Sequence, residues 1–367
     1  MSTAAVGHRP AGPGRDHRAA IALGVVLFLL LAVVLLTWSK WAPYTARART
    51  ISDTDAYPGS NIFDTAGAAG DGPSLSGAWD FTRTYFTAIW QALLAGTVLA
   101  AALDALLPRR WVVGALTGHG RMDAVRAGLA SMPSMMCSCC TAPVAATLRR
   151  CGVSTPAALA YWLGNPLLNP AVLVFLALLL PWQWVVVRVL VGGALVFVAT
   201  SVVVRLTRGT EAPEALLPDA AAQAEALEDP PLREAPMRML RTLARLVLLL
   251  GPELLVLVFA VGLLRGWLLP IDAGAPGPAL VGLLVAVVLG TLLVIPTGGE
   301  IPIVLALGAA GVSPLVLGAL LITLPALSVC SMAMVARALT SRVVLATAGA
   351  VAVGGLAGGA MLAALGG

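Results

Sequence analysis

Long, nearly charge-free apolar runs divide this chain into a series of predicted membrane helices. The clearest runs cover residues 21–37, 92–107, 185–204, 247–264 and 279–295. About 20 apolar residues are enough to cross a bilayer as a helix. Because lipid offers the backbone no hydrogen-bond partner, such a run must satisfy its own amides and carbonyls. The pattern therefore predicts an all-α polytopic membrane protein.

Two further apolar segments are interrupted by prolines and polar residues. Residues 155–181 contain Asn165-Pro-Leu-Leu-Asn169-Pro170, and residues 313–336 contain Leu324-Pro-Ala-Leu-Ser328. A proline inside a helix removes one amide donor and clashes with the preceding turn. We therefore expect two broken spans, each made of two half-helices.

The broken spans belong to an internal repeat with a fixed spacing. Five pairs of identical residues lie 159 positions apart, without a gap: Pro143 and Pro302, Gly152 and Gly311, Val153 and Val312, Ser154 and Ser313, and Pro166 and Pro325. Such a repeat inside a hydrophobic chain is typical of transporters built from two related halves.

Composition and charge support a membrane protein and give it an orientation. The chain is 59% hydrophobic and 11% charged, whereas soluble domains carry about 25% charged residues. Short arginine clusters flank the apolar runs, which indicates cytoplasmic loops rather than a nucleic-acid surface. Arg9, Arg15 and Arg18 place the N-terminus in the cytoplasm. The first run exceeds the roughly 7–15 residues of a signal-peptide core, so we interpret it as an uncleaved helix.

The same charges predict two re-entrant hairpins. The segments around 137–141 and 296–300 are too short for two spans, so we expect each to be the tip of a hairpin. Arg149 and Arg150 follow the first tip, whereas the matching turn of the second carries no charge, which favours opposite orientations. The predicted fold is one extra N-terminal helix and two inverted repeats, each with a helix, a hairpin, a broken span and a helix. The predicted regions are a cytoplasmic N-terminus with the first helix (1–38), an external loop (39–83), the first repeat (84–206), an acidic cytoplasmic linker (207–237) and the second repeat (238–367).

Cysteines gather at the first predicted tip. Cys137, Cys139 and Cys140 fall within four residues there, and thiolates favour soft metals and metalloids. We therefore predict that these three cysteines bind the substrate or a metal. Cysteine and methionine also fill apolar space, which is our interpretation of the neighbouring methionines, of Cys151 and of Cys330. The three histidines all lie outside the apolar runs, which disfavours a histidine-based metalloenzyme.

Polar residues near the helix breaks are the other candidates. Asn165, Asn169, Thr297 and Ser328 are predicted to line a substrate pathway; the asparagines could equally cap the broken helix ends. A carboxylate within the membrane is expensive and is often used for proton coupling. The predicted proton-coupling residues are Glu300, which a hydrated tip should expose to water, and Glu253. We expect Arg188 and Arg265 to snorkel to the interface.

Several motifs together resemble a known family. They are Lys40-Trp-Ala-Pro-Tyr44, Leu107-Pro-Arg-Arg-Trp111, Met136-Cys-Ser-Cys-Cys-Thr-Ala-Pro-Val144 and Trp162-Leu-Gly-Asn165 followed by Asn169-Pro170. The chain resembles the predicted permease family that includes the arsenical efflux permeases, formerly a domain of unknown function, and its YraQ-like members in particular. The resemblance implies a permease of the bacterial cytoplasmic membrane, in a family whose characterised members expel trivalent organoarsenicals.

The sequence thus predicts a secondary transporter and not an enzyme. It would export a thiophilic solute, such as a trivalent arsenical or a soft metal, with no cofactor and with the lipid bilayer as its surroundings. The chain has no G-x-x-x-x-G-K-[ST] motif, so it is not itself a P-loop ATPase. The alternatives are a permease for an unrelated small solute, a membrane thiol-redox protein that cycles Cys139 and Cys140, and a subunit of a complex. A homo-oligomer and a cytoplasmic partner at 207–237 also stay open.

Overall fold

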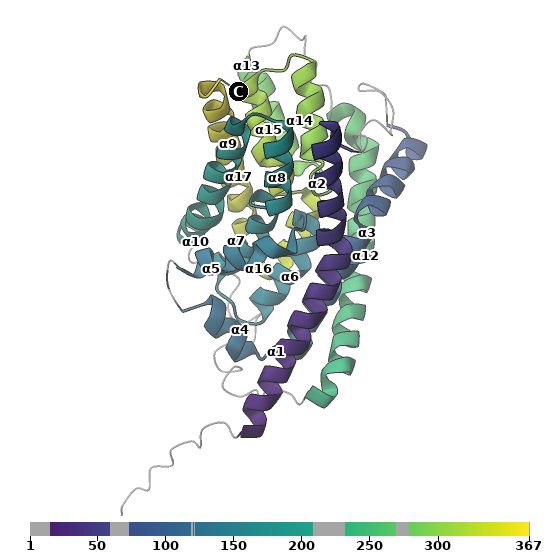
Figure 1. Ribbon diagram of the computed structural model, residues 1–367, viewed down its shortest axis with the longest axis vertical. Coiled ribbons are helices and arrows are strands. Elements are labelled where there is room, and N and C mark those ends of the chain that lie inside the picture. The colour runs from purple at the N-terminus through teal and green to yellow at the C-terminus, as the bar shows by residue number, and fades with distance from the viewer. Residues whose placement is uncertain are drawn as a thin grey trace, which may run out of the picture.

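The computed structural model describes residues 15–58, 73–118, 120, 122–207, 232–268 and 279–366, and within these ranges it contains helices and no strands (Figure 1). Six of its helical segments are long and apolar enough to cross a membrane, or seven if one bent pair is counted as a single span. The all-α, multi-pass prediction is therefore confirmed for the described part of the chain.

The N-terminal region forms one long helical rod. Helix α1 (Arg15–Leu36) continues through a π-helical turn, η1 (Thr37–Trp41), into α2 (Ala42–Thr54), as Figure 1 shows. Residues 39–54, which we expected to start a loop, are thus helical. Their polar composition misled the prediction, because Pro43 sits in the first turn of α2, where a missing amide costs nothing.

The first half continues from α3 to α10. Helix α3 begins at Leu75, well before the predicted start near residue 84, because the Ser74 hydroxyl accepts a hydrogen bond from the Gly77 amide. The elements of this half are α3 (Leu75–Leu106), α4 (Arg109–Leu116), α5 (Met122–Ser131), η3 (Met132–Ser134), α6 (Ser138–Arg150), α7 (Thr155–Leu167), α8 (Pro170–Leu179), α9 (Trp182–Ala194), η4 (Leu195–Ala199) and α10 (Thr200–Leu206).

The second half has fewer and longer elements. They are η6 (Leu232–Glu234), α12 (Ala235–Leu268), α13 (Ala279–Leu292), α14 (Glu300–Ala309), α15 (Pro314–Ala326), α16 (Val329–Leu339) and α17 (Ser341–Ala364). Most of the predicted acidic linker, residues 208–231, lies outside the described residues, as do residues 1–14, 59–72 and 269–278.

The sequence repeat is also a repeat of local structure. Helices α7 and α15 both contain 13 residues, and both their first and their last residues lie 159 positions apart. Helices α8 and α16, and likewise α9 and α17, begin at the same spacing. The turns that precede α7 and α15 match as well, because Gly152 (φ 94°) and Gly311 (φ 83°) adopt the left-handed conformation that favours glycine.

The two halves pack closely against each other. Helix α3 lies along α12, its counterpart in the second half, and α6 of the first half packs on α16 of the second. Helix α17 packs on α15 through glycines: a Cβ atom at Gly359 would collide with the Leu315 carbonyl, and one at Gly318 would lie 2.7 Å from the Gly358 carbonyl oxygen. Small residues that let helix backbones approach are a common packing device in membranes.

Candidate functional site

Four helix interruptions surround the candidate site. We call the non-helical residues 135–137 the first tip and residues 293–299 the second tip; the first kink is Leu168–Asn169 and the second kink is Leu327–Ser328. The second kink bends the α15–α16 pair by 50°. The kinks and the second tip fall where the sequence predicted them, since helix breaking by proline is a local effect. The first tip ends earlier than the predicted 137–141, because Ser138–Thr141 already belong to α6.

The thiols of the first tip form two groups. The Cys137 and Cys140 sulfur atoms lie 3.2 Å apart, whereas the Cys139 sulfur lies 3.1 Å from the Ser328 hydroxyl and 3.7 Å from the Tyr85 hydroxyl. Cys330, which we interpreted as isolated packing, is in side-chain contact with Cys139. All of these cysteines are buried, and none forms a disulfide.

Helix geometry explains this division. Cys137 occupies the N-cap position of α6, and Cys140 lies three residues later on the same face, whereas neighbouring residues on a helix point about 100° apart. The structure therefore does not support one metal site made by Cys137, Cys139 and Cys140, and no cluster of three or more potential ligands suited to a metal occurs among the described residues. The thiol-redox alternative must also be revised. The two sulfur atoms that lie close together belong to Cys137 and Cys140, not to Cys139 and Cys140.

The two predicted pathway asparagines hold the backbone of the first tip and the first kink. Asn165 accepts hydrogen bonds through Oδ1 from the Met136 amide (2.9 Å) and the Ser134 hydroxyl (2.6 Å), which holds the first tip in place. Asn169 Oδ1 accepts from two amides at the start of α8. Both asparagines are fully buried, yet their Nδ2 groups have no hydrogen-bond partner within the described part of the chain. Two buried donors, one beside the first tip and one at the first kink, are thus left for a solute oxygen or for water.

Ser328 plays the same capping part at the second kink. Its hydroxyl accepts from the Ser331 amide while the Ser331 hydroxyl accepts from the Ser328 amide, which makes a reciprocal capping box at the start of α16. The capping interpretation is therefore confirmed for Asn169, the structure adds Ser328 as a second cap, and a pathway role stays a prediction for both.

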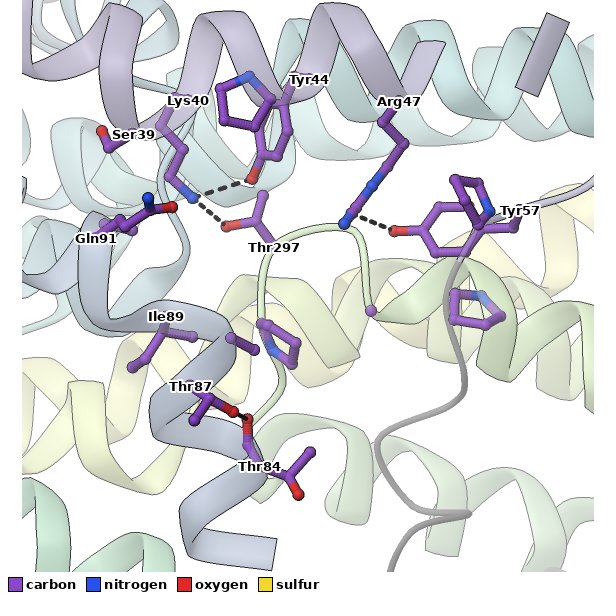
Figure 2. Close-up of a pocket in the computed structure, with 17 residues that line it drawn as sticks. Ser39, Lys40, Tyr44, Arg47, Tyr57, Thr84, Thr87, Ile89, Gln91 and Thr297 are labelled. Carbon is purple, nitrogen blue, oxygen red and sulfur yellow. Dashed lines mark hydrogen bonds between the residues drawn. The ribbon is translucent and has the colours of Figure 1, made fainter. Parts of the chain in front are cut away.

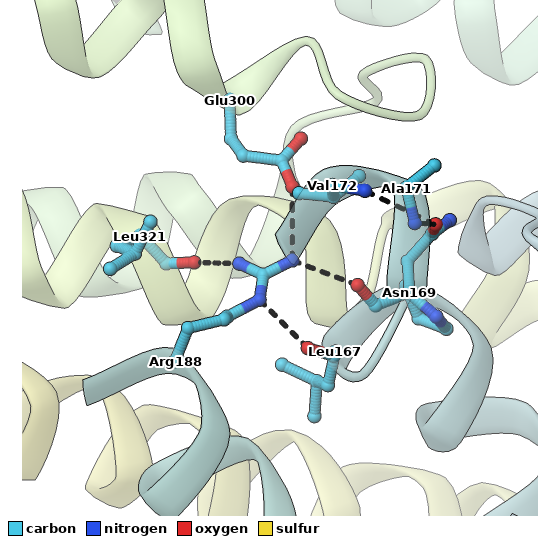
Figure 3. A network of polar contacts seen from close by, with 8 residues as sticks. Leu167, Asn169, Ala171, Val172, Arg188, Glu300 and Leu321 are labelled. Carbon is cyan, nitrogen blue, oxygen red and sulfur yellow. Dashed lines mark hydrogen bonds and ion pairs between the residues drawn. The ribbon is translucent and has the colours of Figure 1, made fainter. Parts of the chain in front are cut away.

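Arg188 does not snorkel, contrary to our expectation. Its side chain is 0% exposed and lies between the two halves, as Figure 3 shows. It donates to the backbone carbonyls of Leu167 (2.8 Å), Pro166 (2.8 Å) and Leu321, and to Glu300 Oε1 (2.9 Å).

The prolines explain why Arg188 is needed there. A helical carbonyl normally accepts from the amide four residues later. Four residues after Pro166 comes Pro170, and four after Leu321 comes Pro325, so both carbonyls lose their helical donor. The Arg188 guanidinium supplies the missing donors. An arginine in an apolar run, combined with prolines at this spacing, was the sequence signal that our reasoning missed.

The two predicted proton-coupling carboxylates differ in environment. Glu300 is 1% exposed and pairs with Arg188, so it is not the hydrated residue that we expected at the second tip, although its Oε2 atom has no hydrogen-bond partner among the described residues. Glu253 forms a 3.1 Å ion pair with Arg337, whose side chain is 56% exposed. Glu253 thus lies toward the surface of the bundle.

A pocket of about 420 Å³ lies beside the second tip, between the N-terminal rod and α3 (Figure 2). Within it, Lys40 Nζ donates to the Tyr44 hydroxyl (3.0 Å) and to the Thr297 hydroxyl (3.3 Å). Thr297, a predicted substrate-binding residue, also contacts the Cys137 thiol through its side chain. The pocket therefore reaches the Cys137–Cys140 pair by way of Thr297. Our sequence reasoning placed Lys40 in a loop and so missed its position.

A multi-pass helical protein with broken helices that meet at buried polar residues has the architecture of a membrane permease. The comparisons with known proteins agree. A family model described as a predicted permease matches residues 74–363, so the chain belongs to this predicted permease family. It is 36% identical over 335 residues to the UPF0718 protein YraQ of Escherichia coli (strain K12), an alignment that covers 90% of this chain and 92% of YraQ.

No solved structure matches the chain. The protein is a multi-pass membrane permease and not an enzyme. Residues 15–58, with Lys40 and the rest of the N-terminal rod, precede the range that the family model matches.

Proposed function

We propose that this permease is a secondary transporter that exports a thiophilic solute, such as a trivalent arsenical or a soft metal, across the bacterial cytoplasmic membrane. The solute would pass between two inverted repeats. It would interact on its way with Cys137, Cys139 and Cys140 and with the polar groups of Asn165, Asn169, Thr297 and Ser328.

The observation that carries this proposal is the contact between the first tip and the second kink. The Cys139 thiol of α6 lies 3.1 Å from the Ser328 hydroxyl at the start of α16, and both side chains are buried. Soft sulfur ligands and a hydroxyl from opposite halves thus face each other where the helices are interrupted. Movement of one half against the other would open and close this contact, as alternating access requires.

The inverted arrangement of the repeats rests on matching helices with unlike flanking charges. Helix α6 ends with Arg149 and Arg150, whereas α14 ends at Ala309 and no charged residue lies near this end. Both turns are exposed, so single cysteines at Arg150 and at Ala309 should react with impermeant maleimides from opposite sides of the membrane. Labelling of both from the cytoplasmic side would overturn the inverted topology.

Glu300 and Glu253 are the proton-coupling residues of this proposal. For Glu300, support comes from its buried position and its unpaired Oε2 atom, because a carboxylate in such a site can exchange a proton when its arginine partner moves away. Glu300→Gln should therefore abolish the dependence of transport on a pH gradient. Glu253→Gln is the companion variant.

Transport into everted membrane vesicles tests the proposal directly. A trivalent organoarsenical and Cu(I) would be offered to the wild type, to Cys139→Ser/Cys140→Ser and to the matched control Cys151→Ser, whose buried thiol lies at the far end of α6. We expect accumulation of at least one solute, loss of it in the double variant and retention in the control. Equal transport by all three proteins would remove the thiols from the mechanism and favour an unrelated small solute.

The 3.2 Å separation of Cys137 and Cys140 favours a second candidate, a membrane thiol-redox protein. Two cysteines spaced C-x-x-C at a helix N-terminus are a common redox arrangement. Mass spectrometry after rapid acid trapping of cells would detect a Cys137–Cys140 disulfide under oxidative stress. A pair that stays reduced throughout would rule this candidate out.

We also propose that the acidic linker binds a cytoplasmic partner and that the protein forms a homo-oligomer. Deletion of residues 211–229 should impair function if the linker docks a cytoplasmic partner, and unchanged transport would argue against that role. The mass of the detergent-free particle in nanodiscs would give the oligomeric state.

A further inference from the structure

The pocket beside the second tip carries two positive charges and no negative one. Lys40 and Arg47 line it, and none of its described lining residues is an aspartate or a glutamate. Lys40 bonds only to hydroxyls, and Arg47 donates to the Tyr57 hydroxyl (3.0 Å) while its guanidinium lies over the Tyr57 ring. Neither cation has a carboxylate partner within the part of the chain that the structure describes.

An unpaired cation in this position is costly. Lys40 is only 5% exposed and lies in a helical segment long and apolar enough to cross the membrane. Burying a charge without a counter-charge is strongly unfavourable. An ionisable residue inside a membrane protein points to a functional site whose partner should be identified. Among the described residues no carboxylate faces Lys40, and the ionisable groups that interact with it are Tyr44, Cys137 and Cys140. A bound anion would supply the counter-charge that these neutral groups lack.

The pocket also has unused hydrogen-bond donors. A lysine ammonium has three donors and a guanidinium has five, whereas Lys40 makes two hydrogen bonds and Arg47 makes one. Figure 2 shows both side chains reaching down from the N-terminal rod on the same side of the pocket. Such donors match the oxygens of a carboxylate, sulfate or phosphate group.

We propose that this pocket binds an anionic, oxygen-bearing group, and that the solute delivered to the thiols is an anion rather than a bare metal cation. This inference rests on the proposed export of a thiophilic solute and names its charge class. A free Cu(I) ion would meet the positive Lys40 next to Thr297 and Cys137. An anionic solute with one soft atom would place its oxygens on Lys40 and Arg47 and its soft atom on the Cys137–Cys140 pair.

Binding to the purified full-length protein in nanodiscs of zwitterionic lipid tests the pocket. Sulfate is the anionic probe, and dimethyl sulfone, which is similar in size but neutral, is its control; both are titrated by calorimetry. We expect sulfate to bind and dimethyl sulfone not to bind. Equal binding of the two probes, or no binding of sulfate, would overturn the assignment.

Variants locate the site. Lys40→Met and Arg47→Met should each weaken sulfate binding about tenfold or more, since each removes a charged hydrogen bond. The matched control is Arg49→Gln, an exposed residue of the same helix that does not line the pocket. Lys40→Arg, which keeps the charge, should restore binding and separates loss of the site from a general folding defect. Equal sulfate binding by Lys40→Met and the wild type would refute the role of Lys40.

Two further measurements are needed. The first distinguishes a lipid headgroup from a free solute as the source of the anion, and the second tests the anion site separately from the proposed export function. If an anionic lipid added to the nanodiscs competes with sulfate, the pocket takes a lipid headgroup as well as a free solute; competition by free anions alone assigns it to the solute. In everted vesicles, a trivalent phenylarsenical with a carboxylate should be transported better than the neutral parent, and Lys40→Met should remove the difference. Thiol-dependent transport without this preference would refute the anion-binding inference and leave the proposed function intact. A preference that persists without the cysteines would support the anion site and refute the role of the thiols in transport.

Discussion

The first and second tips occupy matching places in the repeat but carry different chemistry. The first tip leads into Cys137, Cys139 and Cys140, and the second leads into Thr297 and Glu300. Hydrogen bonds to Asn165 hold the first tip, whereas the Arg188–Glu300 ion pair anchors the second. The same interruption of the helix thus serves a different purpose in each half. The first tip leads into buried thiols, and the second ties the halves together and borders the pocket that contains Lys40 and Arg47.

The two kinks differ from the tips in this respect, because different residue types at the kinks have the same structural role. Asn169 and Ser328 lie 159 positions apart, and each side chain caps the half-helix that follows its kink. The difference between tips and kinks teaches that the repeat preserves backbone hydrogen bonding while the chemistry of the halves diverges.

The largest expected effect comes from breaking the anchor of the second tip. Arg188→Leu leaves Glu300 buried without its counter-charge and leaves three carbonyls without donors, so we expect a loss of about 3–5 kcal/mol in the free energy of unfolding. Denaturant titration in mixed micelles measures it. Arg205→Leu, an exposed arginine near the end of α10, is the control and should change stability by less than about 0.5 kcal/mol. A loss below about 1 kcal/mol for Arg188→Leu would show that the anchor is not needed.

A smaller effect is expected at the first tip. Asn165→Leu introduces the residue type found at the matching position, Leu324, and leaves the Met136 amide without its acceptor, whereas the Ser134 hydroxyl keeps the Ser131 carbonyl. A buried unsatisfied donor costs about 1–3 kcal/mol. The same titration measures the loss, and faster alkylation of Cys137 should accompany it. Unchanged stability would mean that the tip holds its shape without Asn165.

The capping residues at the kinks should give equal and modest effects. Asn169→Ala and Ser328→Ala should each lower stability by about 1 kcal/mol, the usual cost of losing a helix cap. Of these two variants, only Ser328→Ala should also change the reactivity of Cys139, because Ser328 contacts that thiol and no contact with it is found for Asn169 among the described residues. Alkylation rates followed by mass spectrometry would separate the two variants. Equal rates would contradict the contact between the halves.

The smallest effect is expected for the second carboxylate. Glu253→Gln removes an ion pair whose arginine is more than half exposed, and such pairs contribute at most about 1 kcal/mol. We therefore expect a nearly unchanged unfolding midpoint, in contrast to Arg188→Leu. A loss as large as that of Arg188→Leu would place Glu253 among the anchoring residues.

Local features made the helix breaks predictable. Prolines and polar residues act on their own turn of helix, so the kinks at Asn169 and Ser328 and the tip before α14 appear where the sequence indicated. The tip before α6 lies at residues 135–137, ahead of most of the predicted 137–141. The loop expected from residue 39 was wrong because polar composition alone does not end a helix, and the segment continues as α2 to Thr54. That error hid Lys40, since a lysine in a loop has no reason to be buried.

The sequence by itself determined an all-helical membrane protein, the spacing of its repeat and the positions of its breaks, because apolar length and proline act locally. Only the tertiary structure decided the partners of the buried polar groups. Arg188 meets Glu300 across 112 residues, and Lys40 meets Thr297 across 257. The division of the cysteines also depends on the neighbouring half, since Cys139 faces Ser328 of α16. A buried charge is stabilised by whatever the fold brings next to it, and that depends on the packing of distant helices rather than on neighbours in the sequence.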